Sequence, residues 1–211
     1  ERHVTSVKTG AVTFDVFRNK CLENAFRNIP EVTRSRSVDV LREMAKGEAA
    51  LVVGAGPTLS GDLPTIKENR DKFVAISVDA ALKPLLEWGV VPDVVVTCDP
   101  TALSEKKVES ISPKDLGSLP LVYQVDCTPA VVKRFGGAKY VVGSNNSFTQ
   151  WLANIGQKVR KFEGIQSVSH LGFCLADFMG ADPIILAGVD LSFPGGRDHA
   201  LGCAKTWGNG G

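Results

Sequence analysis

The stretch AALVVGAGPTL, residues 49–59, runs from an apolar strand straight into a glycine turn. Gly54 and Gly56 let the backbone bend sharply and let a ligand come close, because no Cβ stands in the way. If a helix follows, its free N–H groups and positive end point at the same place, which is typical of a phosphate site. We therefore expect Gly54, Gly56, Pro57 and Thr58 to bind a nucleotide, although Leu59 replaces the third glycine of the dinucleotide fingerprint. A plain strand-to-helix turn without a ligand is the alternative.

After this stretch, short apolar runs alternate with amphipathic segments, which is how repeated βαβ units look in sequence. The expected strands are Ala50–Val53, Phe73–Val78, Asp93–Cys98, Leu121–Val125, Lys139–Val142, Arg160–Phe162 and Pro183–Ala187. The expected helices are Leu63–Asn69, Ala80–Trp88, Thr128–Phe135, Ser147–Ile155 and Ser167–Met179. This pattern predicts an α/β fold with an open, mostly parallel sheet and helices on both faces, whose ligands lie at the carboxyl ends of the strands.

Residues 1–47 carry helical spacing and predict an N-terminal helical arm, followed by a nucleotide-binding catalytic domain over residues 48–211. The 211 residues are expected to be a piece of a longer protein. A net charge of +1 gives no argument for a nucleic acid or a membrane as partner and leaves small molecules and proteins. Residues 1–20 lack the apolar core of a signal peptide, so we expect a cytoplasmic location.

Polar residues follow several of the expected strands and should meet along one edge of a parallel sheet. Asp79 is placed to accept hydrogen bonds from a ribose, or simply to cap the next helix. Asp99 is placed to hold a divalent cation or ligand hydroxyls, or to start a turn at Pro100. The Ser144, Asn145 and Asn146 side chains suit a base edge or a sugar hydroxyl, or else they cap the helix near Ser147.

The segment of residues 188–200 is too polar and too rich in glycine for a core element, and it is typical of a loop that closes over a ligand. His199 is a candidate general acid or base, with a surface histidine of no consequence as the alternative. Arg197 is suited to pair with a carboxylate or phosphate of the substrate. Ser169 and His170, in the first turn of an expected helix, are further candidates for substrate binding.

Four ordered motifs between residues 49 and 202 resemble one family, which joins the motility accessory factor (Maf) glycosyltransferases with the MptE-like hydroxymethylpterin pyrophosphokinases. The motifs are residues 53–59, residues 82–85 with 89–93, Asp99-Pro100, and residues 183–193 running on to 196–200. The resemblance implies a Rossmann-like domain that transfers a nonulosonic acid from a CMP-activated donor to serine or threonine of flagellin. It also implies that His199, Asp190 and Asp198 lie on the acceptor or leaving-group side, with the nucleotide on the glycine turn, Asp79 and Asn145.

Two other activities remain open within this resemblance. One is transfer of diphosphate from ATP, with Mg²⁺, to a hydroxymethylpterin, and the other is nucleotide binding without catalysis. The segment Thr97-Cys98-Asp99-Pro100 holds fewer carboxylates than the pterin kinase branch tends to place there, which favours the glycosyltransferase. Thr58 departs from the more usual serine.

Overall fold

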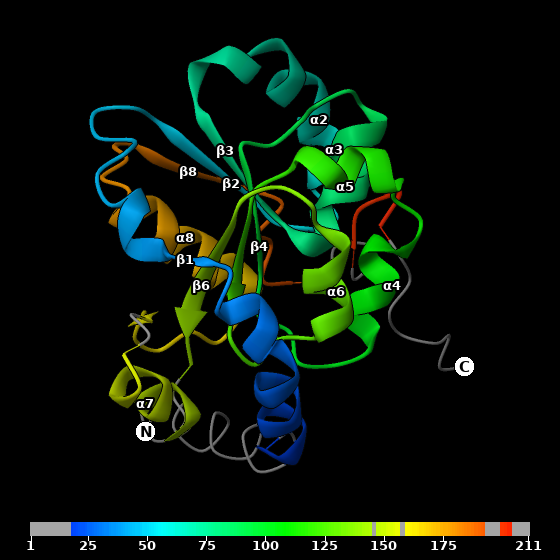
Figure 1. Cartoon of the computed structure of the whole chain (residues 1–211). Helices are drawn as coiled ribbons and strands as arrows, with labels where there is room; N and C mark the ends of the chain where they lie inside the picture. The colour runs from blue at the N-terminus through cyan, green and yellow to red at the C-terminus, as the bar shows by residue number, and fades with distance from the viewer. Residues whose placement is uncertain (1–17, 145–146, 157–158, 193–198, 204–211) are drawn as a thin grey trace, which may run out of the picture.

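The computed structural model describes residues 18–144, 147–156, 159–192 and 199–203, which build a parallel β-sheet with helices on both faces (Figure 1). The strands are β1 (Arg36–Ser37), β2 (Ala50–Val53), β3 (Val74–Val78), β4 (Val94–Thr97), β5 (Leu121–Gln124), β6 (Lys139–Gly143), β7 (Arg160–Lys161) and β8 (Ile184–Ala187). Every strand pairing is parallel. The expected fold class is confirmed, and each expected strand is present to within one or two residues at its ends.

The strand order is β1-β6-β5-β4-β3-β2-β8. The short strands β1 and β7 both pair with β6, β1 at Tyr140 and Val141 and β7 at the next two residues. The chain therefore starts the central sheet at β2, builds outward through β3 to β6, and returns to place β8 on the other side of β2. Val53, the last residue of β2, pairs with Ser77 of β3 and with Ala187 of β8. In open parallel sheets, the crevice where the direction of building reverses is the usual ligand site, and here it lies at the carboxyl ends of β2 and β8.

The helices cover both faces of the sheet. They are α2 (Leu59–Glu68), α3 (Leu82–Glu87), α4 (Leu103–Glu109), α5 (Pro113–Ser118), α6 (Pro129–Arg134), α7 (Ser147–Asn154) and α8 (Val168–Phe178), with 3₁₀ turns at Val38–Leu41, Arg70–Lys72 and Asp79–Ala81. Figure 1 shows α3, α4 and α6 on one side of the sheet and α8 on the other. α4 and α5 are not among the expected elements, and α2 begins four residues earlier than expected.

α8 lies directly on the centre of the sheet. A Cβ on Gly172 would stand 2.9 Å from Cγ1 of Val52, so the absence of a side chain lets the helix approach β2 closely. Leu171 and Leu175 on the same helix are fully buried. This close packing fixes the N-terminal end of α8 beside the carboxyl ends of the strands.

The N-terminal segment is helical over residues 18–32, as expected, but Arg36–Ser37 then joins the sheet as β1. Periodicity alone did not indicate this two-residue polar strand. The helix is fastened to the carboxyl edge of the sheet because the side-chain amides of Asn24 and Asn28 each donate to two backbone carbonyls, at 2.8–3.2 Å. These carbonyls belong to Pro100, Val125, Asp126 and Cys127, in the loops after β4 and β5. The expected boundary after residue 47 stays a prediction.

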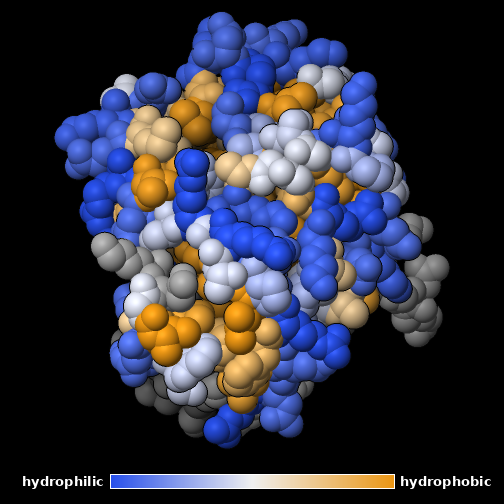
Figure 2. Space-filling view, viewed as in Figure 1, coloured by the Kyte–Doolittle hydropathy of each residue, from blue (hydrophilic) through white to orange (hydrophobic). Residues whose placement is uncertain are grey.

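On the side drawn in Figure 2, apolar residues gather in several places, among them the lower part of the molecule, where Figure 1 places α7 and the N-terminal helix. Phe26 and Phe148 stack edge to face with ring centroids 5.0 Å apart, and Trp151 lies 5.3 Å from Phe148. None of the helices within the described ranges has the length and apolar character needed to cross a bilayer.

Candidate functional site

A cavity of about 520 Å³ opens at the switch point of the sheet, between the carboxyl ends of β2 and β8 and the start of α8. Its size lies within the usual range for small-molecule sites, roughly 300–1,000 Å³. Seven of its polar or glycine lining residues are Gly56, Asp79, Lys107, Ser169, His170, Asp190 and His199. The cavity thus gathers six of the residues selected from the sequence, together with one lysine that was not.

The glycine turn is packed against the loop that follows β8. The N–H of Gly54 donates to the carbonyl of Ala187 at 2.8 Å, and the N–H of Gly56 donates to the carbonyl of Gly188 at 2.7 Å. A Cβ on Gly56 would stand 2.6 Å from a carboxylate oxygen of Asp190. The glycines are therefore needed for loop packing as well as for any approach of a ligand. The alternative of a plain strand-to-helix turn without a ligand stays open.

Asp190 caps the helix that follows the glycine turn. Its carboxylate accepts a hydrogen bond from the N–H of Thr58 at 2.9 Å and a second, short one from the Thr58 hydroxyl. A carboxylate at this place satisfies a free N–H of the helix and is favoured by the helix dipole. Asp190 thus ties the loop after β8 to the start of α2. If Asp190 also has a catalytic role, its carboxylate must perform that role while it binds Thr58.

Asp79 is a buried hydrogen-bonding centre at the end of β3, with 1% of its side chain exposed. Its oxygens accept from the N–H of Ala80 at 2.7 Å and from the hydroxyls of Thr97 and Ser104, both at 2.9 Å. The ammonium of Lys107 lies 3.6 Å away. These four partners match the roughly four acceptor positions of a carboxylate, an arrangement that favours the capping alternative over ribose binding.

Asp99, at the end of β4, pairs with the same lysine. Its Oδ2 accepts from Lys107 Nζ at 2.9 Å, and its Oδ1 accepts from both the N–H and the hydroxyl of Thr101 at 2.8 Å. Lys107 is among the cavity's lining residues, whereas Asp99 is not. Within the described ranges, no cluster of three or more histidine, cysteine or acidic side chains is arranged to hold a metal ion.

The pairing shifts both pKa values. Burial works to raise the pKa of Asp99, but the Lys107 ammonium and the Thr101 donors outweigh it and hold that pKa below its usual value. Burial works to lower the pKa of Lys107, but Asp79 and Asp99 outweigh it and raise that pKa. Both shifts favour the charged forms, so the ion pair is fixed across the physiological pH range.

These shifts predict how stability depends on pH. Because the folded pKa of Asp99 is depressed, its contribution is complete above the unfolded value of about 3.9 and is lost as the pH falls through the folded value. Because the folded pKa of Lys107 is raised, its contribution is complete below about 10.4 and is lost as the pH rises through the folded value. Urea unfolding of Asp99→Asn should show a smaller loss of stability below pH 4 than the unchanged protein. An identical acid limb in both would contradict the assignment.

The two histidines face the cavity from different elements. His170 lies in the first turn of α8, where the hydroxyl of Ser167 caps the helix by accepting from the His170 N–H at 3.1 Å. His199 begins a segment that docks on the glycine turn, because the N–H of Ala200 donates to the carbonyl of Ala55 at 2.9 Å. The cavity therefore holds one imidazole above the glycine turn and one at the start of α8.

The remaining predicted residues lie elsewhere. Ser144 is buried at the end of β6, where its N–H donates to the Thr149 hydroxyl at 3.0 Å, and it is not among the cavity's lining residues. Asn145, Asn146, Arg197 and Asp198 lie outside the described residues. Their roles stay predictions.

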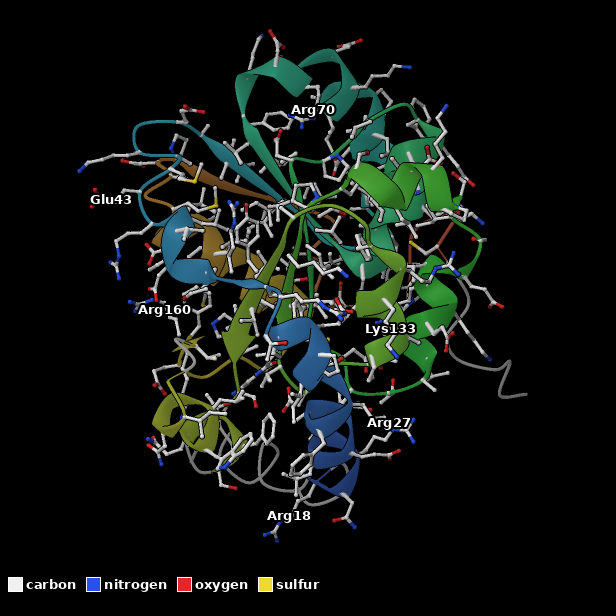
Figure 3. All side chains as sticks on the ribbon, in the orientation of Figure 1. Arg18, Arg27, Glu43, Arg70, Lys133 and Arg160 are labelled. Carbon is white, nitrogen blue, oxygen red and sulfur yellow. The ribbon has the colours of Figure 1, made fainter. Side chains whose placement is uncertain are left out.

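A second cavity, of about 560 Å³, lies between the N-terminal helix, the start of α4 and α6. Arg27 and Lys133, both labelled in Figure 3, belong to its lining. Arg27 pairs with Glu23 at 2.7 Å on the exposed helix surface, and such pairs contribute little energy. We place the candidate site in the switch-point cavity because that cavity gathers six of the residues selected from the sequence.

The matching family is described as 6-hydroxymethylpterin diphosphokinase MptE-like, and it matches residues 23–196. Two curated relatives are 6-hydroxymethyl-7,8-dihydropterin pyrophosphokinases. The one from Methanocaldococcus jannaschii is 32% identical over 89 residues, which are 40% of this chain and 37% of the relative. The one from Methanothermobacter thermautotrophicus is 28% identical over 141 residues, which are 66% of this chain and 56% of the relative.

The chain thus spans 37% and 56% of the length of these two relatives. Among solved structures, the Maf glycosyltransferase from Magnetospirillum magneticum AMB-1 superposes with a TM-score of 0.61 at 22% identity. That match covers 74% of this chain and 27% of the glycosyltransferase, and it shows a shared fold. Because the family match extends over most of the chain and the fold agrees with it, the chain belongs to the MptE-like family.

Proposed function

We propose that this chain is a transferase domain that binds a nucleotide-activated donor in the switch-point cavity and transfers a nonulosonic acid from CMP to a serine or threonine hydroxyl of flagellin. The observation that carries the proposal is the cavity itself. It lies where parallel α/β sheets bind nucleotides, and it holds two imidazoles and a fixed ammonium. The cytoplasmic location stays a prediction.

Glycosyl transfer needs a proton acceptor and a stabilised leaving group. In the proposed reaction the bond between the anomeric carbon and the phosphate oxygen breaks, and its electron pair stays on CMP. The acceptor oxygen bonds to the anomeric carbon, and its proton passes to His199. Asp99, the candidate ligand for Mg²⁺, already binds Lys107 and Thr101, so the proposal does not depend on a metal there.

A second candidate function is transfer of diphosphate from ATP to the hydroxymethyl group of a pterin. The names of both curated relatives favour it. The geometry favours it less, because ATP–Mg²⁺ needs carboxylates free to bind the metal, whereas the carboxylates of Asp79, Asp99 and Asp190 are all engaged by donors of the protein.

Ligand-dependent thermal unfolding separates these functions. With CMP or CDP at about 100 times its dissociation constant, we expect the melting temperature to rise by about 5–10 °C, because a ligand that binds only the folded state stabilises it by mass action. AMP and ATP with Mg²⁺ are the matched controls and should give no comparable rise. The reverse pattern would favour the diphosphokinase, and no response to any nucleotide would contradict both functions.

A further inference from the structure

We propose that the ammonium of Lys107 contacts the ligand directly and binds the phosphate of the donor. The sequence pattern did not indicate this residue. It lies on α4, a helix that was not expected from the sequence. The inference rests on the proposed function for the identity of the donor. Its test also uses an inorganic anion, so that the phosphate contact and the proposed function can fail separately.

Lys107 lies at the inner wall of the switch-point cavity with 12% of its side chain exposed. Lysine side chains are almost never so buried unless they are paired. Among the lining residues that the structure describes, Lys107 is the one whose side chain carries a permanent positive charge. An oxyanion entering the cavity therefore meets one fixed cation.

The pairing of Lys107 leaves donor capacity for a ligand. An ammonium has three N–H donors. One is taken by Asp99 at 2.9 Å, and a second faces Asp79 at 3.6 Å. Among the residues that the structure describes, no further acceptor is bound to this ammonium, so the third N–H is left for the cavity that the side chain lines.

The two carboxylates hold the lysine in place from the side of the protein, and Asp79 also lines the cavity. The Asp79 carboxylate is held in turn by hydrogen bonds from the N–H of Ala80 and the hydroxyls of Thr97 and Ser104. The second oxygen of Asp99 is occupied by Thr101. The ammonium is thus held before the ligand arrives, and a phosphate that binds it avoids most of the entropy cost of fixing a long side chain.

The helix offers a matched control one residue away. Lys106 lies on the same helix and carries the same charge, but its side chain is exposed and does not line the cavity. A general electrostatic effect of charge on α4 would appear in both variants, whereas a direct contact would appear only at Lys107.

The experiment compares Lys107→Met with Lys106→Met by calorimetric titration of CMP, cytidine and inorganic pyrophosphate. We expect Lys107→Met to weaken CMP and pyrophosphate by about 10- to 100-fold, as for loss of a hydrogen bond to a charged group, and to leave cytidine unchanged. Lys106→Met should leave all three unchanged. Equal weakening of CMP and cytidine would show a structural role and overturn the proposal, as would unchanged binding of both phosphate ligands.

Two further arms keep the test decisive. Lys107→Met leaves two buried carboxylates without their cation, so the double variant Lys107→Met/Asp99→Asn, which removes both members of the closer pair, is measured beside it. It should show the same selective loss of CMP. Free N-acetylneuraminic acid carries a carboxylate and no phosphate, and its binding should not depend on Lys107. A loss confined to this sugar acid would reassign the contact to a carboxylate and overturn the phosphate assignment.

Discussion

Replacing Asp79 with alanine is expected to lower the free energy of unfolding by about 3–5 kcal/mol, the usual cost of removing one partner of a buried ion pair. The change leaves the hydroxyls of Thr97 and Ser104 and part of the Lys107 ammonium without their acceptor. Each of these buried donors then lacks a hydrogen bond that offsets the cost of removing it from water. Urea unfolding followed by circular dichroism measures the effect.

Asp62→Ala is the matched control for this change. Asp62 lies in the first turn of α2, and surface substitutions of this kind usually change stability by less than about 0.5 kcal/mol. If Asp79→Ala proved as mild as Asp62→Ala while nucleotide binding was lost, Asp79 would be a ligand contact, as first expected, and not a structural centre.

Replacing His199 with alanine is expected to reduce the rate of transfer by about 10²–10⁴-fold, the usual contribution of a general base. The loss should appear in kcat, because the imidazole is assigned to the acceptor proton and not to nucleotide binding. A transfer assay with a CMP-activated sugar and flagellin measures the rate, and the affinity for CMP should remain within a factor of a few.

The other imidazole of the cavity provides the comparison. His170, at the start of α8, is assigned to substrate binding, so His170→Ala should raise KM more than it lowers kcat. Normal turnover in His199→Ala would show that His199 is not the general base. A loss of kcat in His170→Ala with normal turnover in His199→Ala would assign the base to α8.

Most of the sheet could be predicted because its strands are continuous apolar runs. Val52, Ile76 and Val96 are fully buried in the centre of a parallel sheet, and residues of this type mark such strands in sequence. The positions of Gly56, Asp79 and Asp190 at the carboxyl ends of strands follow from the same pattern, because parallel strands end at one edge.

The partners of these residues could not be predicted in the same way. α4 reads LSEKKVE and buries only Ser104 and Val108, so it has too weak an apolar pattern to be recognised. Lys107 was missed with it. Asp190 meets Thr58 across 132 positions of the chain, and a single sequence does not show such a contact.

The helix of residues 18–32 limits how far the N-terminus of this domain can be shortened. Two asparagine amides on that helix supply the hydrogen bonds for four carbonyls at the ends of β4 and β5. A shortened polypeptide starting at residue 48 would keep most of the sheet but leave those loops without their donors, next to the segment that holds Asp99. We therefore expect a shortened form to need the asparagine-bearing helix if these loops are to keep their structure.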